Sequence, residues 1–173
     1  MKVDSFVDFY EDLKLKVDEE LKNNISNSTA AVENTDCTSK KSLLEAVKSY
    51  SNILNSHART GIVHYIRFGE ILLKLKLLYW RRCEDCKNEE SLEYISCKRC
   101  SQISDSKDFF DDVYKVYPYK SSYINFIIRI YRLGHQYHKF KYIPLSVSVI
   151  IHHIGNLEKK MANDKDFWCL NVR

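Results

Sequence analysis

The sequence predicts an all-α protein of about five to six helices, with a small four-cysteine zinc hairpin inserted between them. Only four Gly and two Pro occur in 173 residues, too few for the many turns of a β architecture. Apolar side chains recur every three or four positions over long stretches, which is typical of helices that bury one face. An apolar content of 45% can fill the core of one ordinary domain.

The N-terminal residues 1–22 are predicted to form an acidic amphipathic helix. Their apolar side chains have helical spacing, at Val3, Phe6, Tyr10, Leu13, Val17 and Leu21. Residues 23–39 are rich in Asn, Ser and Thr and show no periodicity, which predicts a flexible linker. Residues 40–173 are then expected to form a helical domain, with the zinc hairpin inserted at residues 82–101.

Five further helices are predicted after the linker. Helical periodicity covers residues 40–55 and 58–82. A short helix follows the cysteines and ends before Pro118, because proline restricts the residue that precedes it. A serine begins the next helix, over residues 121–139, and Ser146 begins the last.

Four cysteines form the clearest site in the sequence. Cys83 and Cys86 make one Cys-x2-Cys pair, and after ten residues Cys97 and Cys100 make a second. Each pair presents two thiolates from one tight turn, so two pairs complete a tetrahedral zinc site. The segment resembles a small zinc ribbon or knuckle hairpin, with residues 94–96 predicted as a short strand. Because four sulfurs leave no open coordination position, we expect one structural Zn²⁺ ion.

Other uses of the same cysteines stay open. An iron centre uses the same ligands, and spacing alone does not separate iron from zinc. A redox role is typical of Cys-x2-Cys pairs on a βα unit, which this sequence does not show. Cys37 and Cys169 belong to no motif. We expect an intracellular protein of the nucleus or cytoplasm, neither secreted nor membrane-bound, because neither a secretory signal nor a spanning apolar run is visible.

Charge is distributed unevenly along the chain, although the formal net charge is only +4. Residues 1–36 hold nine acidic side chains and four lysines, whereas residues 113–157 hold six Lys and Arg residues and no Asp or Glu. The acid-free region also contains seven tyrosines. Phosphate binding needs positive charge that no nearby acid cancels, and tyrosine rings can stack on bases. This region is therefore predicted to contact nucleic acid.

Within residues 121–139, polar and basic side chains repeat at steps of three or four and share one helical face. Asn, Arg and Gln suit contacts with base edges, and a helix of this size fits the DNA major groove. Three basic residues of the 58–82 helix repeat every seven positions. An ordinary solvated face is the alternative interpretation. The predicted nucleic-acid contacts are Arg67, Lys74, Arg81, Lys115, Lys120, Asn125, Arg129, Arg132, Gln136, Lys139 and Lys141.

Two functions from different classes fit these patterns. The first is a zinc-stabilised, non-catalytic nucleic-acid-binding protein, with DNA favoured over RNA, that reads or clamps nucleic acid with residues 113–157. The second is a protein–protein adaptor, or a subunit of a larger complex, with a purely structural zinc. A protein partner or a homodimer fits either function. We expect no enzyme activity and no small-molecule substrate, because no phosphate loop, nucleophile with its base or metal-binding carboxylate set is visible.

Overall fold

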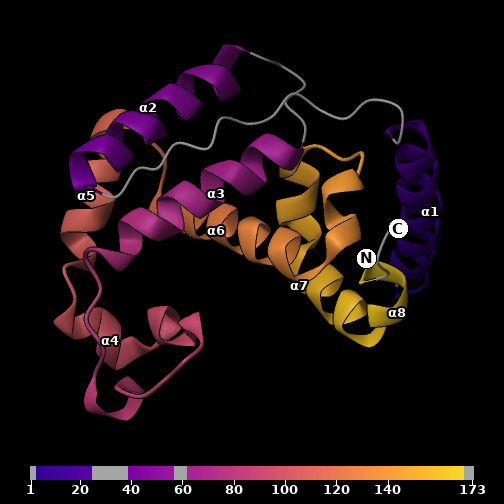
Figure 1. The fold of residues 1–173 in the computed structure, drawn as a ribbon. Coiled ribbons are helices and arrows are strands. Elements are labelled where there is room, and N and C mark those ends of the chain that lie inside the picture. Colours follow the sequence, from indigo (N-terminus) through magenta and orange to yellow (C-terminus); the bar gives the residue numbers. More distant parts are fainter. Residues whose placement is uncertain (1–2, 25–38, 57–61, 170–173) are drawn as a thin grey trace.

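The computed structural model describes residues 3–24, 39–56 and 62–169, and within these ranges it contains helices and no strands (Figure 1). The all-α prediction is confirmed. Three 3₁₀ helices join the α-helices: η1 (Glu84–Cys86), η2 (Leu92–Ser96) and η3 (His138–Tyr142). The α-helices are α1 (Val3–Asn24), α2 (Lys40–Ser56), α3 (Ile62–Leu77), α4 (Lys98–Ile103), α5 (Ser106–Val116), α6 (Ser121–Gln136), α7 (Val147–Asn163) and α8 (Lys165–Trp168).

The six predicted helices correspond to α1, α2, α3, α5, α6 and α7. The sequence missed α4 and α8, because helices of six and four residues are too short to show a period. The strand predicted at residues 94–96 is wrong, since these residues belong to η2. The linker predicted at residues 23–39 falls mostly on residues 25–38, outside the described part of the chain. None of the described helices is both long and apolar enough to cross a membrane.

Helices α3 and α6 end earlier than predicted. Helix α3 ends at Leu77, where the amides of Leu78 and Tyr79 bond to carbonyls three residues back and turn the chain towards the cysteines. Helix α6 ends at Gln136 and not at residue 139, because residues 138–142 form η3. It begins at Ser121 as predicted, but its N-cap is Lys120, which provides no side-chain cap. Ser146 caps α7 as predicted, because its Oγ accepts a hydrogen bond from the Val149 amide at 3.4 Å.

Helices α3 and α6 form the centre of the molecule and make its most extensive contact. Glycines allow the two backbones to approach closely. A Cβ added at Gly69 of α3 would meet the Ile127 carbonyl of α6 and lie 2.7 Å from Tyr131 Cβ. A Cβ at Gly134 would lie 2.7 Å from Ile66 Cδ1. These positions set the short distance between the two helices.

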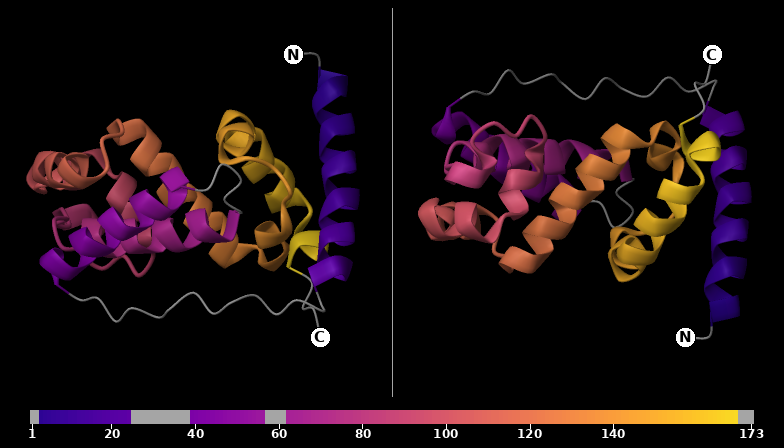
Figure 2. Two further views of the ribbon diagram at one scale, coloured as in Figure 1. Left: turned by 90° about the horizontal axis from the view of Figure 1, so that it is seen from above. Right: turned by 90° about the horizontal axis from the view of Figure 1, so that it is seen from below.

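Helix α6 passes from one apolar core to another. Its first half, with Ile124 and Ile127, packs among α2, α3, α5 and the cysteines. Its second half, with Ile130 and Leu133, packs among α1, η3, α7 and α8. Figure 2 shows α1 lying across the end of the molecule beside α7 and α8, while the cysteine-containing residues lie at the other end. Because α6 belongs to both cores, it joins the two ends of the molecule.

Helix α1 packs its apolar face against η3, α7 and α8. Tyr10 is 3% exposed, and its hydroxyl donates to Asp164 Oδ2 at 2.8 Å while accepting from Trp168 Nε1 at 2.8 Å. Lys14 Nζ also bonds to Asp164 Oδ2, at 3.0 Å. The acidic face contributes as well, since Asp18 Oδ1 lies 3.2 Å from Lys139 Nζ. The second core therefore depends on α1 being in place.

Candidate metal centre and the adjoining groove

The four predicted ligands Cys83, Cys86, Cys97 and Cys100 converge in space. Their Sγ atoms all lie within 4.8 Å of one another, and Cys83 Sγ is 3.9 Å from Cys97 Sγ. A tetrahedral zinc site with Zn–S bonds of about 2.3 Å places its sulfurs about 3.8 Å apart. The cluster could therefore hold a metal ion, and the described residues contain no other group of three or more side chains arranged to do so.

Local backbone structure places each pair of thiols on a tight turn. In the first pair, the Cys86 amide donates to the Cys83 carbonyl at 3.1 Å, which closes η1. In the second, Cys97 is the N-cap of α4, so Cys100 lies one helical turn further on. The Cys83 amide donates to Cys100 Sγ at 3.2 Å and ties the two turns together. Such N–H to sulfur bonds stabilise a thiolate before any metal binds.

The four thiols differ in acidity because their surroundings differ. Backbone amides at the start of α4, that of Cys100 first, lower the pKa of Cys97 to about 7. Burial and the neighbouring thiols raise the pKa of Cys86. Burial likewise raises the pKa of Cys100. A cation that enters the cluster would therefore meet one readily formed thiolate and would displace protons from the others.

The metal-binding segment, residues 82–101, is fastened to the helices at both of its ends. The Arg81 amide donates to Ser104 Oγ at 2.6 Å, and the Asp105 amide donates to the Tyr79 carbonyl at 3.0 Å. Inside the segment, Ile95 is 5% exposed and belongs to the same core as three of the cysteines, α3 and α6. The segment is thus part of the main core and holds a fixed position beside α6.

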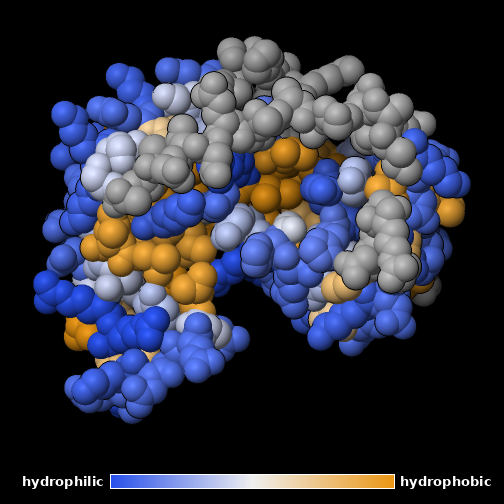
Figure 3. Space-filling model, viewed as in Figure 1, coloured by the Kyte–Doolittle hydropathy of each residue, from blue (hydrophilic) through white to orange (hydrophobic). Residues whose placement is uncertain are grey.

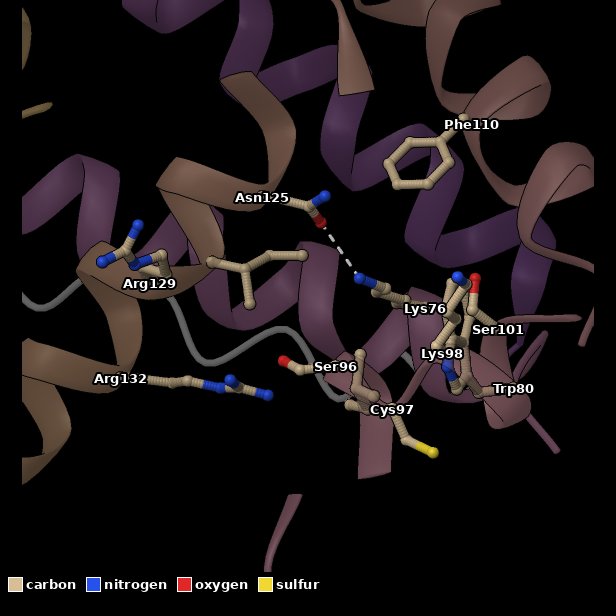
Figure 4. Close-up of a pocket in the computed structure, with 12 residues that line it drawn as sticks. Lys76, Trp80, Ser96, Cys97, Lys98, Ser101, Phe110, Asn125, Arg129 and Arg132 are labelled. Carbon is tan, nitrogen blue, oxygen red and sulfur yellow. Dashed lines mark hydrogen bonds between the residues drawn. The ribbon is translucent and has the colours of Figure 1, made fainter. Parts of the chain in front are cut away.

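A groove runs between the metal-binding segment and α6. It begins as a cavity of about 480 Å³ between α3, the segment and α6 (Figure 4). A second cavity of about 370 Å³ shares Ser96, Arg129 and Arg132 with the first and continues towards α7. On the face drawn in Figure 3, the surface is hollowed between the segment and the half that contains α7 and α8. We call the two cavities the α6 groove, lined by Lys76, Trp80, Ile95, Ser96, Cys97, Lys98, Ser101, Phe110, Asn125, Ile128, Arg129, Arg132, Leu133, Gln136, Tyr137 and Glu158.

Four of the eleven predicted nucleic-acid contacts line this groove: Asn125, Arg129, Arg132 and Gln136. The helical face that the sequence singled out is therefore real, but it is turned towards the metal-binding segment. Arg132 Nη2 donates to the Leu92 carbonyl of that segment at 3.1 Å. Arg129 makes a two-pronged ion pair with Glu158 of α7, at 3.0 Å from Nε and 2.8 Å from Nη2.

The predicted basic stripe of the 58–82 helix does not form a free surface. Arg67 and Lys74 both pair with Glu70, the second at 3.2 Å, as expected for residues four apart. Arg81 lies beyond the end of α3, so it leaves the seven-residue register. The structure places these three residues outside the α6 groove.

The remaining predicted contacts also lie away from the groove. Lys115 is 3.5 Å from Asp112, and Lys139 is only 7% exposed because it packs against Phe167 and pairs with Asp18. Lys120 and Lys141 are exposed. The expectation that nothing cancels the charge of residues 113–157 is thus wrong, because Asp112, Glu158 and Asp18 come from outside that stretch.

The groove residues that sequence reasoning missed include Lys76, Trp80, Lys98 and Phe110. Lys76 is 6% exposed, and its Nζ donates to Asn125 Oδ1 at 3.0 Å (Figure 4). Burial, together with the charge of Arg132, lowers the pKa of Lys76 to about 8. A signal was present, because Lys76 stands within the otherwise apolar run at residues 75–79.

Neither a protein-family model, nor a curated protein, nor a solved structure matches this chain. Similarity to known proteins therefore adds nothing to the chemistry of the site. The function is inferred from the four cysteines and from the groove beside them.

Proposed function

We propose that this chain is a zinc-stabilised, non-catalytic nucleic-acid-binding protein that holds a single strand in the α6 groove. The composition of the groove carries this proposal. Cationic side chains and the amides of Asn125 and Gln136 lie beside the aromatic rings of Trp80 and Phe110, and Glu158 is the one carboxylate among the lining residues. Positive charge with aromatic rings is the combination that binds single strands.

Zinc is the metal we propose for the four cysteines. A closed set of four thiolates selects zinc or iron, and zinc is the ion that such sites use for structure alone. The Cys97 turn also forms one wall of the groove, through Ser96, Cys97 and Lys98. Bound metal would thus fix that wall, so the two parts of the proposed function depend on each other.

A single strand suits the groove better than a duplex. The DNA major groove is about 12 Å wide, which leaves room for one helix of about 10–12 Å diameter. Helix α6 has its polar face walled by the metal-binding segment, to which Arg132 is bonded, and by α7, to which Arg129 is bonded. A duplex would have to displace both walls, whereas a single strand needs only the groove.

The lining residues have separate roles in this proposal. Arg132 and Lys98 would contact phosphates, because neither pairs with a carboxylate of the described residues. Asn125 and Gln136, which are exposed on α6, would contact base edges. No catalysis is assigned to the groove, because its single carboxylate, Glu158, is occupied by Arg129.

The test is fluorescence anisotropy with labelled single-stranded DNA, single-stranded RNA and duplex DNA, all with hydroxyl ends, across a salt series. We expect zinc-loaded protein to bind a single strand more tightly than duplex, with an affinity that falls steeply with salt. Arg132→Gln should weaken binding about tenfold and reduce the salt slope by about 0.7. The matched control is Lys159→Gln, an exposed charge on α7 outside the groove, which should change little.

Two outcomes would count against the proposal. If the protein bound duplex DNA more tightly than a single strand, the nucleic acid would bind on a surface other than the groove. Absence of binding to every probe at low salt would reject nucleic-acid binding and leave the adaptor function as the remaining proposal. DNA and RNA probes of the same sequence decide between the two nucleic acids, because only RNA offers a 2′-hydroxyl.

A further inference from the structure

The inner end of the α6 groove contains a buried ammonium group without a counter-ion. Lys76 is 6% exposed, and its Nζ contacts Asn125 Oδ1 at 3.0 Å and lies 4.5 Å from the Trp80 ring centre and 5.7 Å from that of Phe110. None of these groups carries a negative charge, and Lys76 pairs with no carboxylate in the described part of the chain. A buried charge without a partner is costly, so such a group marks a place where an anion would be favoured.

Neighbouring cations add to the positive charge around this cavity. Lys98 and Arg132 line the same 480 Å³ cavity, which has no carboxylate in its lining. Arg129, the fourth cation, is already neutralised by Glu158 from outside that cavity. Trp80, which also lines the cavity, has a buried Nε1–H without an acceptor among the described residues. Three cations without a carboxylate partner thus line one volume.

Of the four cysteines, only Cys97 lines this cavity. Four thiolates with one divalent cation carry a net charge of −2 together. However, Figure 4 shows the Cys97 sulfur pointing away from Lys76 and from the space between Lys76, Asn125 and Arg132.

We propose that this cavity is a binding site for a phosphate monoester, held by Lys76, Lys98 and Arg132 with the side-chain amide of Asn125. In the nucleic-acid complex it would receive the phosphorylated end of the strand. This second statement rests on the proposed function, whereas the first needs only the cavity. A free nucleotide offers the same chemistry and is the other source of the group.

A monoester fits the cavity better than an internal phosphodiester. At neutral pH a monoester carries between one and two negative charges, whereas a diester carries one, so a monoester balances three cations more fully. Lys76 is also nearly enclosed, so only a group that projects inwards can reach its ammonium. A terminal phosphate projects in this way, while an internal phosphate is flanked by a sugar on each side. The volume of about 480 Å³ lies within the range of small-ligand pockets, so it holds more than the phosphate alone.

The first measurement is calorimetric titration of zinc-loaded protein with adenosine 5′-monophosphate and with adenosine. We expect adenosine 5′-monophosphate to bind at least about tenfold more tightly, because charge-assisted hydrogen bonds to phosphate are among the stronger ones. Inorganic phosphate should compete with the nucleotide. Equal affinity for the nucleotide and the nucleoside would overturn the proposal, because it would show that the phosphate is not recognised.

Variants then assign the effect to the cavity. Lys76→Met keeps an unbranched apolar side chain one atom shorter and removes the charge, so nucleotide affinity should fall at least about tenfold. Arg132→Gln is the second variant, in case the first does not fold. Lys159→Met, at an exposed position of α7, is the control for the loss of one charge and should bind as wild type does. Unchanged nucleotide binding by a folded Lys76→Met would overturn the assignment.

The last comparison separates this site from the proposed function. It uses single-stranded oligonucleotides of one sequence with a 5′-phosphate, a 3′-phosphate or hydroxyl ends. Tighter binding of one phosphorylated form, abolished by Lys76→Met, supports the strand-end site and identifies the end. Nucleotide binding through Lys76 with no oligonucleotide binding would retain the cavity and reject the proposed function. Oligonucleotide binding with no contribution from a phosphate or from Lys76 would retain the function and reject the cavity.

Discussion

Replacement of Lys76 by methionine should make the folded protein more stable at neutral pH. The side chain is 6% exposed, and burial lowers its pKa from 10.5 to about 8. This shift corresponds to about 3 kcal/mol by which the charged form is disfavoured in the folded state. Methionine removes that penalty and loses one hydrogen bond to Asn125, worth about 1 kcal/mol. We therefore expect Lys76→Met to raise the free energy of unfolding at pH 7 by about 1–3 kcal/mol.

The extra stability of Lys76→Met over wild type should disappear as the pH rises. Between pH 8 and 10.5 the unfolded chain keeps the Lys76 proton that the folded chain has already released. Wild-type stability therefore increases with pH across this window, and Lys76→Met lacks this contribution. The two proteins should differ most at pH 7 and converge towards pH 10.

Urea unfolding followed by circular dichroism, at four pH values between 7 and 10 with zinc in excess, measures this difference. Other titrating groups, including the cysteines and tyrosines, affect both proteins alike and cancel in the comparison. Stability curves that run parallel, or a variant that is less stable throughout, would show that Lys76 supports the fold. Lys76 would then be a structural contact, and the cavity would have no uncompensated charge to attract an anion.

Three further predictions concern the metal, the helix contact and α1. Cys97→Ser should release the metal and lower the melting temperature, since such sites contribute on the order of 10 kcal/mol in zinc-binding peptides; metal content and circular dichroism measure both. Gly69→Ala should destabilise by about 1–3 kcal/mol, because its Cβ would meet the α6 backbone, whereas Gly155→Ala, with open space around its Cβ, should be neutral or stabilising. Burial tends to raise the pKa of Asp164, but hydrogen bonds from Tyr10 and Lys14 outweigh burial, so the pKa is lowered. The contribution of this carboxylate to stability should therefore be lost as the pH falls through 3.8 and below. Asp164→Asn should remove that part of the acid sensitivity, as measured by urea unfolding between pH 5 and 2.5.

Each of these predictions has an outcome that contradicts it. Retention of one equivalent of metal by Cys97→Ser would mean that a fourth ligand comes from elsewhere. Equal effects of Gly69→Ala and Gly155→Ala would mean that α3 and α6 are further apart than described. An acid transition that is the same in wild type and Asp164→Asn would mean that the contact between α1 and the C-terminal helices does not depend on this carboxylate.

The helices and the metal ligands were predictable because their signals are local. Apolar side chains three or four residues apart define a helix before any tertiary contact is known, and six of the eight described α-helices follow this rule. The Cys-x2-Cys pairs work in the same way, since each places two sulfurs on one turn. The structure of the residues between the pairs was not predictable, because η2 has the composition of a short strand and is decided by packing of Tyr94 and Ile95 into the core.

The charge pattern misled because ion pairs join residues far apart in sequence. Residues 113–157 contain no acid, yet Glu158 pairs with Arg129 and Asp18, from the first helix, pairs with Lys139. A linear count cannot show such partners, since Coulomb attraction acts through space. The same limit hid Lys76, which borders the predicted site only because α3 packs against α6.

The sequence by itself determined an all-helical chain with four cysteines spaced as metal ligands, because helical periodicity and ligand spacing are properties of neighbouring residues. The tertiary structure alone decided which cations remain without a carboxylate partner. It turned the polar face of α6 towards the metal-binding segment, buried Lys76, and placed Lys76, Lys98 and Arg132 around one cavity. The physical reason is that the electrostatic state of a side chain depends on burial and on neighbours in space, and both are fixed only when the helices pack.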